Sequence, residues 1–468
     1  MQIIHVVLLT ILLLLALLAA RMPVALSLGL SGAIGLVLLR GFGYGTSTLA
    51  SVPFTSTASF TLTIIPMFIL MGMFAVRANI ATNVFAVANH FVGRAPGGLG
   101  VATVMACAGF SAVSGSSIGT AATVSRLAVG QMRSAGYPAS LATGIVAVAG
   151  TLGVMIPPST FLVLYAVLAR ESVAATLAAG IVPGILSATA YITYIMVIGQ
   201  RAIRTEMAKR KVPAGAAVGH DGGGEASEMA NAISDARHEL GERAVRMRDL
   251  PWRGVTHVVI LFLVVMGGMY SGLFTSTESA AVGALAGLII LITENRRSGF
   301  REIARAFRQS LLDTAQTTSM VFLIVIGSGL LSAFLVTAGV TQSITQWVTN
   351  LGLDPKLLMA LLLLCLLPLG MFLESMSILV LAVPLLHPIA MDFGFDGVWL
   401  GIMIVKLIEI GMTTPPIGII TFVVAGTAKV NPETVFRGVG PLVIVDLILT
   451  TILFLVPGIT LFLPSLIR

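Results

Sequence analysis

Long apolar runs recur along the chain and restrict it to a fold embedded in a membrane. Many of them reach the roughly 18–20 residues that an α-helix needs to cross the ~30 Å hydrocarbon core of a bilayer. Of 468 residues, 57% are hydrophobic and 10% are charged, whereas a soluble domain carries about 25% charged residues. The sequence therefore predicts an all-α, polytopic membrane protein. We expect crossings at residues 3–20, 24–39, 55–76, 138–169, 174–199, 255–272, 277–293, 312–336, 396–428 and 438–466.

The basic residues predict the orientation of these crossings. With the N-terminus outside, 22 of the 27 Lys and Arg residues fall on the inner side and four on the outer side, and Lys406 lies inside a crossing. Because inner loops of membrane proteins are enriched in Lys and Arg, we expect a bacterial inner-membrane protein with both termini in the periplasm. The net charge of +7 then faces the lipid bilayer at the cytoplasmic leaflet, and no nucleic-acid partner is needed to explain it.

Two further apolar stretches, at 96–132 and 356–391, are interrupted near their middles by Gly, Ser and Pro residues. We interpret both as re-entrant helical hairpins, the first opening inward and the second outward. Each precedes a crossing with two consecutive prolines, "GTLGVMIPPST" at 150–160 and "EIGMTTPPIGI" at 409–419. The same offset of 258 residues relates Pro415 to Pro157 and Glu374–Ser375 to Ser116–Ser117. An inverted repeat with discontinuous helices at matching positions indicates a transporter with a site at mid-membrane.

This repeat divides the chain into five predicted parts. Residues 1–60 are N-terminal scaffold helices, and 61–200 are the first repeat, with the inward hairpin 96–132 and the broken helix 138–169. Residues 201–254 are an inserted cytoplasmic loop. Residues 255–311 are scaffold helices and an amphipathic arm, and 312–468 are the second repeat, with the outward hairpin 356–391 and the broken helix 396–428. The basic, amphipathic stretches 77–94 and 296–312 predict interfacial helices.

The broken helices suggest what the repeats bind. A Pro-Pro pair removes two backbone donors and interrupts the helix, and lipid cannot satisfy the carbonyls that this frees. Hydroxyls and free carbonyls suit a weakly held cation such as Na⁺, while helix N-termini attract an anion. We predict a first Na⁺ site at Ser114, Gly115, Ser116, Ser117, Thr151 and Gly153. We predict a second Na⁺ site at Gly370, Glu374, Ser375, Gly411, Thr413 and Thr414. The candidate substrate-binding residues are Ser116, Ser117, Pro157, Ser375, Pro415 and Lys406.

Several of the polar residues allow more than one role. "SAVSGSSIGTAATVS" at 111–125 contains Gly-x-Ser-x-Gly, which presents a nucleophilic serine in hydrolases, or it can be a small-residue packing face. Lys406 and Glu409 lie three residues apart and either neutralise each other or involve Lys406 in substrate binding. Glu278 follows Ser and Thr residues, and we expect it to cap a helix N-terminus.

The stretch from "GFSAVSGSSIGTAATVS" to "GTLGVMIPPST", with "GLFTSTESAAVGAL" and "EIGMTTPPIG", resembles the large membrane (M) subunit of TRAP transporters, the tripartite ATP-independent periplasmic family of the ion-transporter superfamily. The resemblance covers nearly the whole chain. It implies Na⁺-coupled secondary uptake of a small organic acid, such as a C4-dicarboxylate, a sialic acid or a similar carboxylate. It also implies a scaffold with a transport domain that moves as an elevator. The implied partners are a small membrane subunit (Q type) and a periplasmic substrate-binding protein (P type).

The sequence departs from the family pattern at three places. Residues 205–250 are longer than the usual loop. Glu374 stands where the family commonly has an aspartate, in "FLDM". Leu407, beside the unusual Lys406, stands where an asparagine often precedes "EIG", which leaves the second ion site and the specificity open. Two alternatives remain: a stand-alone Na⁺/carboxylate symporter of the same superfamily and, more remotely, a membrane serine hydrolase.

Overall fold

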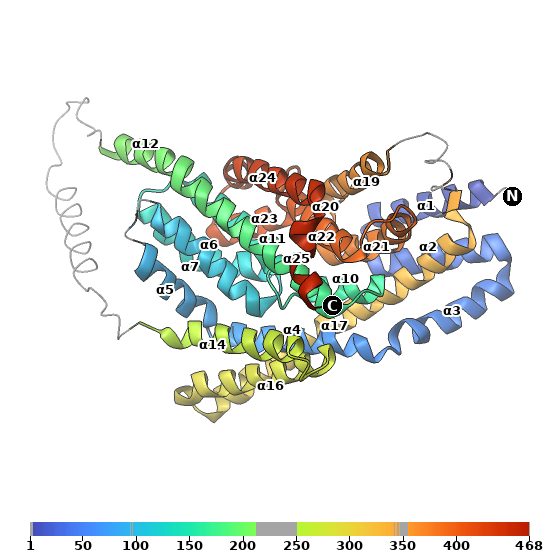
Figure 1. Cartoon of the computed structure of the whole chain (residues 1–468), viewed down its shortest axis with the longest axis horizontal. Helices are drawn as coiled ribbons and strands as arrows, with labels where there is room; N and C mark the ends of the chain where they lie inside the picture. Colours follow the sequence, from blue (N-terminus) through green and yellow to red (C-terminus); the bar gives the residue numbers. More distant parts are fainter. Residues whose placement is uncertain are drawn as a thin grey trace.

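The computed structural model describes residues 3–93, 95, 97–211, 250–340, 342, 343, 346 and 354–467. The regular elements of this part of the chain are helices (Figure 1). The predicted loop 201–254 falls mostly on residues outside the described ranges. The first half contains α1 (Ile3–Ala19), α2 (Val24–Arg40), α3 (Phe42–Thr57), η1 (Phe60–Thr63), α4 (Ile64–Arg77), α5 (Ile80–Val92), α6 (Gly98–Ser114), α7 (Ser117–Ser134), α8 (Ala139–Gly150), α9 (Leu152–Met155), α10 (Thr160–Ala169), α11 (Val173–Tyr194), η2 (Ile195–Gly199) and α12 (Gln200–Lys211). The second half contains α14 (Trp252–Phe262), η4 (Leu263–Gly267), α15 (Gly268–Tyr270), α16 (Ser276–Glu294), η5 (Asn295–Ser298), α17 (Phe300–Thr337), α19 (Pro355–Leu364), α20 (Leu366–Phe372), α21 (Ser375–Asp392), α22 (Gly397–Thr413), α23 (Ile419–Ala428), α24 (Pro432–Leu455) and α25 (Pro457–Ile467).

Among these described residues, eight helices are long and apolar enough to cross a membrane, or nine when the bent pair of 139–155 and 160–169 counts as one crossing. The prediction of a polytopic helical membrane protein is confirmed. The eight are Phe60–Arg77, Val173–Glu206, Trp252–Tyr270, Ser276–Arg297, Phe300–Thr337, Pro355–Phe372, Ser375–Asp392 and Pro432–Leu455.

Several predicted crossings need correction. Helices α1 and α2 lie where crossings 3–20 and 24–39 are predicted, but they have 17 residues each and are about 25 Å long, at the short end of the range for a crossing; that they cross stays a prediction. The predicted arm 296–312 and crossing 312–336 are largely one helix, α17, of 38 residues, because no proline or glycine interrupts residues 300–326. It measures about 57 Å, which exceeds the thickness of the hydrocarbon core.

The predicted crossing 438–466 is present as the candidate span Pro432–Leu455, but its C-terminal bound is wrong, because residues 457–466 belong to a second helix. Helix α24 ends at Leu455 and α25 begins at Pro457. A proline offers no backbone donor and disfavours a helical conformation in the residue before it, and Val456 accordingly leaves the helix, with φ −124° and ψ 74°. Helix α25 packs on α11 and α22. Helix α3 was not predicted, because its many Ser, Thr and Gly residues give it a low hydropathy.

Both predicted hairpins are present as pairs of contacting helices. In the first, α6 ends at Ser114, Gly115 with a φ of +59° turns the chain, and α7 follows. In the second, α20 ends at Phe372 and α21 begins after Glu374. The two tips are capped in the same way, at positions related by the repeat offset. Ser116 caps α7 and Glu374 caps α21, and each side chain accepts a hydrogen bond from a backbone N–H of the first helical turn. Side-chain acceptors of this kind satisfy N–H groups that lipid would leave unpaired.

The two Pro-Pro segments break their helices as predicted. The first helix stops at Met155 and resumes at Thr160, with a bend of 45° across the break. The second stops at Thr413 and resumes at Ile419. Both Pro-Pro peptide bonds are cis. The order of hairpin, broken helix and long helix therefore occurs twice, as α6–α11 and α20–α24, and the inverted orientation of the two halves stays a prediction.

The helices pack in two groups. In the first, α17 runs along α2, α3 and α4, and α4 packs on α16 (Figure 1). In the second, α8 packs on α7 and α24, and α22 packs on α20 and α21. The groups meet where α4 contacts α6 and α10 and where α17 contacts α21, including a 2.9 Å hydrogen bond from the Ser328 hydroxyl to the Val380 carbonyl. The hairpin tips lie at this boundary.

The predicted cap at Glu278 is confirmed. Glu278 and Thr275 form a reciprocal capping box at the start of α16, in which each side chain accepts a hydrogen bond from the backbone N–H of the other residue. Such a box pairs two N–H groups that a helix start otherwise leaves free.

Close approach of α2 and α17 depends on Gly32. A Cβ atom there would lie 2.6 Å from the Leu331 backbone nitrogen, so Gly32→Val must push the helices apart. We expect a loss of about 1–3 kcal/mol in stability, typical of overpacking, seen as a lower unfolding temperature of the purified protein. Gly130→Val is the matched control, because its Cβ meets open space. Equal melting of the two variants would contradict this packing.

Candidate functional site

The two hairpin tips converge on one buried carboxylate. Glu409 lies on α22, one turn before the second break, and is 1% exposed. The Ser117 hydroxyl of the first tip donates to Glu409 Oε1 at 3.3 Å, and the Ser375 hydroxyl of the second tip donates to the same oxygen at 3.0 Å. The other oxygen, Oε2, is buried and has no hydrogen-bond partner in the described part of the chain. One oxygen of this buried carboxylate is therefore unpaired among the described residues, and Glu409 does not itself line the cavity that lies beside the tips.

A cavity of about 340 Å³ lies beside these tips. Ser114, Ser116 and Ser117 line it from the first tip, and Glu374 and Met376 line it from the second. The opposite wall comes from α4 and α17, so both helix groups contribute. The lining from α4 and α17 includes Ile69, Gly72, Met73, Val76, Thr317 and Met320. The volume of this cavity lies in the range that is typical of small-molecule binding sites.

The charge on the cavity wall comes from one side chain, and helix N-termini also face the cavity. Among the described residues that line it, Glu374 is the one charged side chain, and it is negative. The first turns of three helices also line it: α7 with Ser117–Gly119, α10 with Thr160 and Phe161, and α21 with Met376. Helix N-termini carry partial positive charge and free N–H groups. The cavity therefore combines one carboxylate with the partial positive charge of three helix N-termini.

The residues predicted for the first Na⁺ site cluster at the first tip. The Thr160 hydroxyl donates to the Gly115 carbonyl at 3.0 Å, and the Ser114 and Thr120 hydroxyls are 2.9 Å apart. Gly153 lets the broken helix approach the tip, because a Cβ there would lie 2.7 Å from the Ser116 carbonyl oxygen. Thr151 is buried and donates to the Val148 carbonyl within its own helix. The structure thus brings Gly115, Ser116 and Gly153 together, and their role as Na⁺ ligands stays a prediction.

The residues predicted for the second Na⁺ site also lie close together. Gly370 and Gly411 mark the crossing of α20 and α22, where a Cβ at Gly370 would lie 2.8 Å from the Gly411 Cα. The Thr413 and Thr414 hydroxyls both donate to the Ile410 carbonyl, at 2.9 and 2.5 Å. The N–H of Gly418, just after the break, donates to the Met371 carbonyl of the hairpin at 3.3 Å. Their contact with Na⁺ stays a prediction as well.

The predicted substrate residues are less closely grouped. Ser116 and Ser117 line the cavity, whereas Ser375 turns toward Glu409 and does not. Neither proline lines it: Pro157 is buried in the first break, and Pro415 is exposed in the second.

Lys406 lies away from the tips. Its ammonium group pairs with Asp446 on α24 and donates to the Ser187 hydroxyl on α11 at 3.0 Å, and both charged side chains are at most 4% exposed. Of the two alternatives for Lys406, mutual neutralisation with Glu409 is wrong, because the ion-pair partner of Lys406 is Asp446. This placement favours a structural ion pair that joins three helices over contact with substrate.

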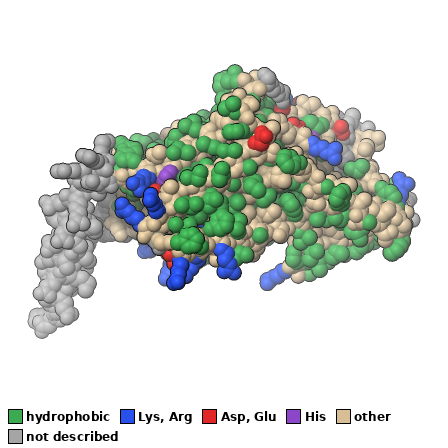
Figure 2. All heavy atoms as spheres, turned by 90° about the horizontal axis from the view of Figure 1, so that it is seen from below, with side chains coloured by type: hydrophobic (Ala, Val, Ile, Leu, Met, Phe, Trp, Pro, Cys, Tyr) green, Lys and Arg blue, Asp and Glu red, His purple; other side chains and the backbone are tan. Residues whose placement is uncertain are grey.

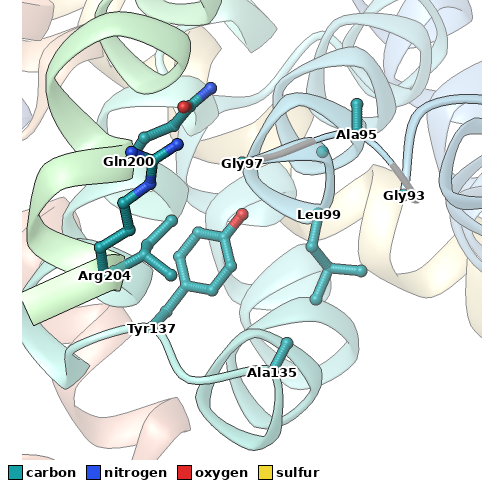
Figure 3. Close-up of a pocket in the computed structure, with 10 residues that line it drawn as sticks. Gly93, Ala95, Gly97, Leu99, Ala135, Tyr137, Gln200 and Arg204 are labelled. Carbon is teal, nitrogen blue, oxygen red and sulfur yellow. The ribbon is translucent and has the colours of Figure 1, made fainter. Parts of the chain in front are cut away.

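A second cavity, of about 290 Å³, lies at the opposite end of the first hairpin (Figure 3). Gln200 and Arg204 of α12 line one side of it, and the Tyr137 hydroxyl points toward the start of α6, where it accepts a 3.1 Å hydrogen bond from the Gly100 N–H. The 17 residues of α6 place this cavity about 25 Å from the tips. It is therefore separate from the candidate site.

Sequence reasoning missed Glu409 as a site residue. Its three-residue spacing from Lys406 suggested an ion pair within the helix. Because of this suggested pair, the position of Glu409 one turn before the second helix break was overlooked. A usable signal was present: Glu409 precedes Thr413 by four residues, so both lie on one face of α22. The partner serines come from two hairpins far apart in sequence, which no local pattern relates.

A cavity at the tips of two helical hairpins, each followed by a broken helix, in a multi-pass membrane protein is typical of transporters. Comparison with known proteins gives the family. The model of the tripartite ATP-independent periplasmic transporter, DctM component, matches residues 11–459, and the chain belongs to this family.

Individual proteins agree with this assignment. The chain is 33% identical over 439 residues to the C4-dicarboxylate TRAP transporter large permease protein DctM of Pseudomonas aeruginosa, which covers 94% of each chain. It is 31% identical over 457 residues to the sialic acid TRAP transporter large permease protein SiaM of Vibrio cholerae, with 97% of each covered. The crystal structure of the YdaH transporter of Alcanivorax borkumensis shares the fold, with a TM-score of 0.60, 15% identity and 89% of each chain covered. The relatives are named as permeases, which points to transport and not to catalysis.

The ion pair of Lys406 and Asp446 can be tested by breaking it. Lys406→Met leaves the Asp446 carboxylate buried without its partner, and we expect a loss of about 3–5 kcal/mol in stability. The double variant Lys406→Met, Asp446→Leu removes both charges and should recover most of this loss. Thermal unfolding of the purified variants is the measurement. Normal melting of Lys406→Met together with lost uptake would instead support a role in substrate binding.

Proposed function

We propose that this chain is the large membrane subunit of a Na⁺-driven transporter that takes up a small organic acid. The observation that carries the proposal is the shared carboxylate: Ser117 and Ser375, from hairpins related by the repeat, both donate to Glu409 Oε1, and Oε2 is left without a partner among the described residues. A cation at Oε2 would hold in place the carboxylate whose Oε1 joins the two tips, so that ion binding and tip closure are coupled.

Charge favours a cation at this place. Glu374 and Glu409 put two carboxylates at the tips, and burying an ionised group at mid-membrane costs about 2.5–3.5 kcal/mol on insertion scales. The surrounding ligands are hydroxyls and backbone carbonyls, which suit a small hard cation. Na⁺ bound at both tips would neutralise the carboxylates and let an organic anion approach. Each Na⁺ that enters gains about 2.3 kcal/mol per 100 mV of membrane potential, which can drive accumulation without ATP.

The cavity fits a small carboxylate. Its volume of about 340 Å³ accepts a molecule the size of a C4-dicarboxylate, and three helix N-termini supply N–H groups for carboxylate oxygens. The relatives with these names transport a C4-dicarboxylate or a sialic acid, and we place the substrate of this chain in the same chemical class of small organic acids.

The boundary position of the cavity supports an elevator cycle. One wall belongs to the hairpin tips and the other to α4 and α17. In the proposed cycle, the group that holds both tips slides along α4 and α17 and carries substrate and Na⁺ across. The family name describes a three-part periplasmic system, so we propose a small membrane subunit and a periplasmic substrate-binding protein as partners. The alternative within transport is a stand-alone symporter that needs neither.

Reconstitution tests this function. In liposomes that contain the chain, its small subunit and its binding protein, uptake of the organic acid should require an inward Na⁺ gradient. We expect Glu409→Gln, which keeps the size of the side chain but removes its charge, to reduce Na⁺-dependent uptake by at least tenfold. Ser117→Ala with Ser375→Ala should raise the Na⁺ concentration needed for half-maximal uptake. Ser51→Ala, at an exposed serine of α3, is the matched control.

Two results would contradict the proposal. Uptake that is equal with Na⁺ or choline gradients would exclude Na⁺ coupling, and an unchanged Na⁺ titration in Glu409→Gln would remove Glu409 from the ion site. Uptake by the chain alone, without binding protein and small subunit, would instead favour the stand-alone symporter.

A further inference from the structure

A basic pocket that shares no residue with the tip cavity lies where the start of α14 meets the end of α16. It has a volume of about 500 Å³. Arg253 and His257 come from α14, and Thr293, Glu294, Arg296 and Arg297 come from α16 and the 3₁₀ turn η5 that follows it. The transport function proposed above uses none of these residues.

The pocket carries excess positive charge. Its carboxylate, Glu294, lies 3.9 Å from His257 Nδ1. None of the three guanidinium groups forms an ion pair with a residue in the described ranges. Three arginines against one glutamate therefore leave a surplus of two charges, and guanidinium groups bind phosphate oxygens through paired hydrogen bonds. In Figure 2, which shows the face with α14 and α16, Lys and Arg side chains gather around a histidine and an acidic side chain near one end.

The surface below the pocket is apolar and exposed. Ile260 lies on the same face of α14 as Arg253, seven residues deeper, and Ile289 lies on the same face of α16 as Thr293. Both isoleucines are exposed, at 43% and 54%, and both helices belong to candidate membrane spans. Trp252 is exposed at the start of α14, the position where tryptophan anchors helices at the membrane surface. The pocket thus combines a basic rim with a hydrocarbon-like floor.

We propose that this pocket binds the phosphate headgroup of an anionic phospholipid, with the acyl chains along the exposed faces of α14 and α16. Basic pockets between membrane helices on the cytoplasmic side recognise such headgroups, and the Lys and Arg distribution puts this end of both helices on that side. A soluble anion would use the arginines alone, whereas a phospholipid also covers Ile260 and Ile289. The lipid would hold the α14–α16 corner while the tips move.

Native mass spectrometry of the intact purified chain tests the assignment. With phosphatidylglycerol added, we expect bound lipid that phosphatidylcholine does not displace. The triple variant Arg253→Gln, Arg296→Gln, Arg297→Gln should bind phosphatidylglycerol at least tenfold more weakly, which corresponds to ~1.4 kcal/mol. The control Arg201→Gln, Lys429→Gln, Arg437→Gln removes three exposed charges elsewhere on the predicted inner side and should leave binding unchanged.

A charge-retaining variant and two competing ligands distinguish a lipid site from the alternatives. Arg253→Lys, Arg296→Lys, Arg297→Lys retains the charge and should restore most of the binding, and it guards against misfolding of the Gln variant. Equal loss in the Gln and control triples would overturn the site. Equal affinity for glycerol phosphate and phosphatidylglycerol would make it a free-anion site. Retention of the small membrane subunit by the unsubstituted chain but not by the Gln triple, with no change in lipid, would make it a protein interface.

Discussion

Broken backbone in an apolar environment needs polar partners, and the rest of the structure is arranged around that need. Four helix ends meet near the two hairpin tips, and each would expose N–H or carbonyl groups that lipid cannot pair. Other side chains of the protein pair some of these groups. Ser116 and Glu374 accept hydrogen bonds from N–H groups at the starts of α7 and α21. Thr160 donates to a carbonyl of the first hairpin turn, and Thr421 donates to a carbonyl at the second helix break. Glu409 is only partly paired. Its Oε1 accepts hydrogen bonds from both tips, whereas its Oε2 has no hydrogen-bond partner among the described residues, and the proposed cation would bind there.

Small residues make this arrangement possible. A Cβ at Gly153 would meet the Ser116 carbonyl, and a Cβ at Gly370 would meet Gly411. Lipid tails are as apolar as leucine side chains, so helices in a membrane associate mainly through close packing and polar contacts. The glycines let the broken helices touch the tips directly. The pair of Lys406 and Asp446 adds a different link, because it ties α22 to α24, and Lys406 also reaches Ser187 on α11. Movement of the second broken helix would therefore carry these two helices with it.

Local patterns in the sequence were reliable where one rule dominated. The Pro-Pro pairs predicted both breaks, the mid-hairpin Gly and Ser residues predicted both turns, and the position of Glu278 predicted its capping box. The local patterns failed where two of them pointed to different structures. Helix α3 was not predicted, because its many hydroxyl groups lower its hydropathy. Helix α17 continues through a basic stretch that was expected to be a separate arm. For Lys406, spacing along one helix offered Glu409 as one possible partner, whereas the carboxylate that pairs with it comes from α24, 40 residues further along the chain.

By itself the sequence determined that the protein lies in a membrane and that it belongs to the class of transporters. The long apolar runs require a membrane, the uneven distribution of Lys and Arg indicates an orientation, and the matched repeat indicates a transporter. These properties follow from composition and from spacing along the chain. Only the tertiary structure decided which polar groups meet. Ser117, Ser375 and Glu409 are separated by up to 292 residues, and the walls of the cavity come from both helix groups. Such contacts depend on how whole helices pack, and helix packing is set by side-chain shape across surfaces that no local pattern describes.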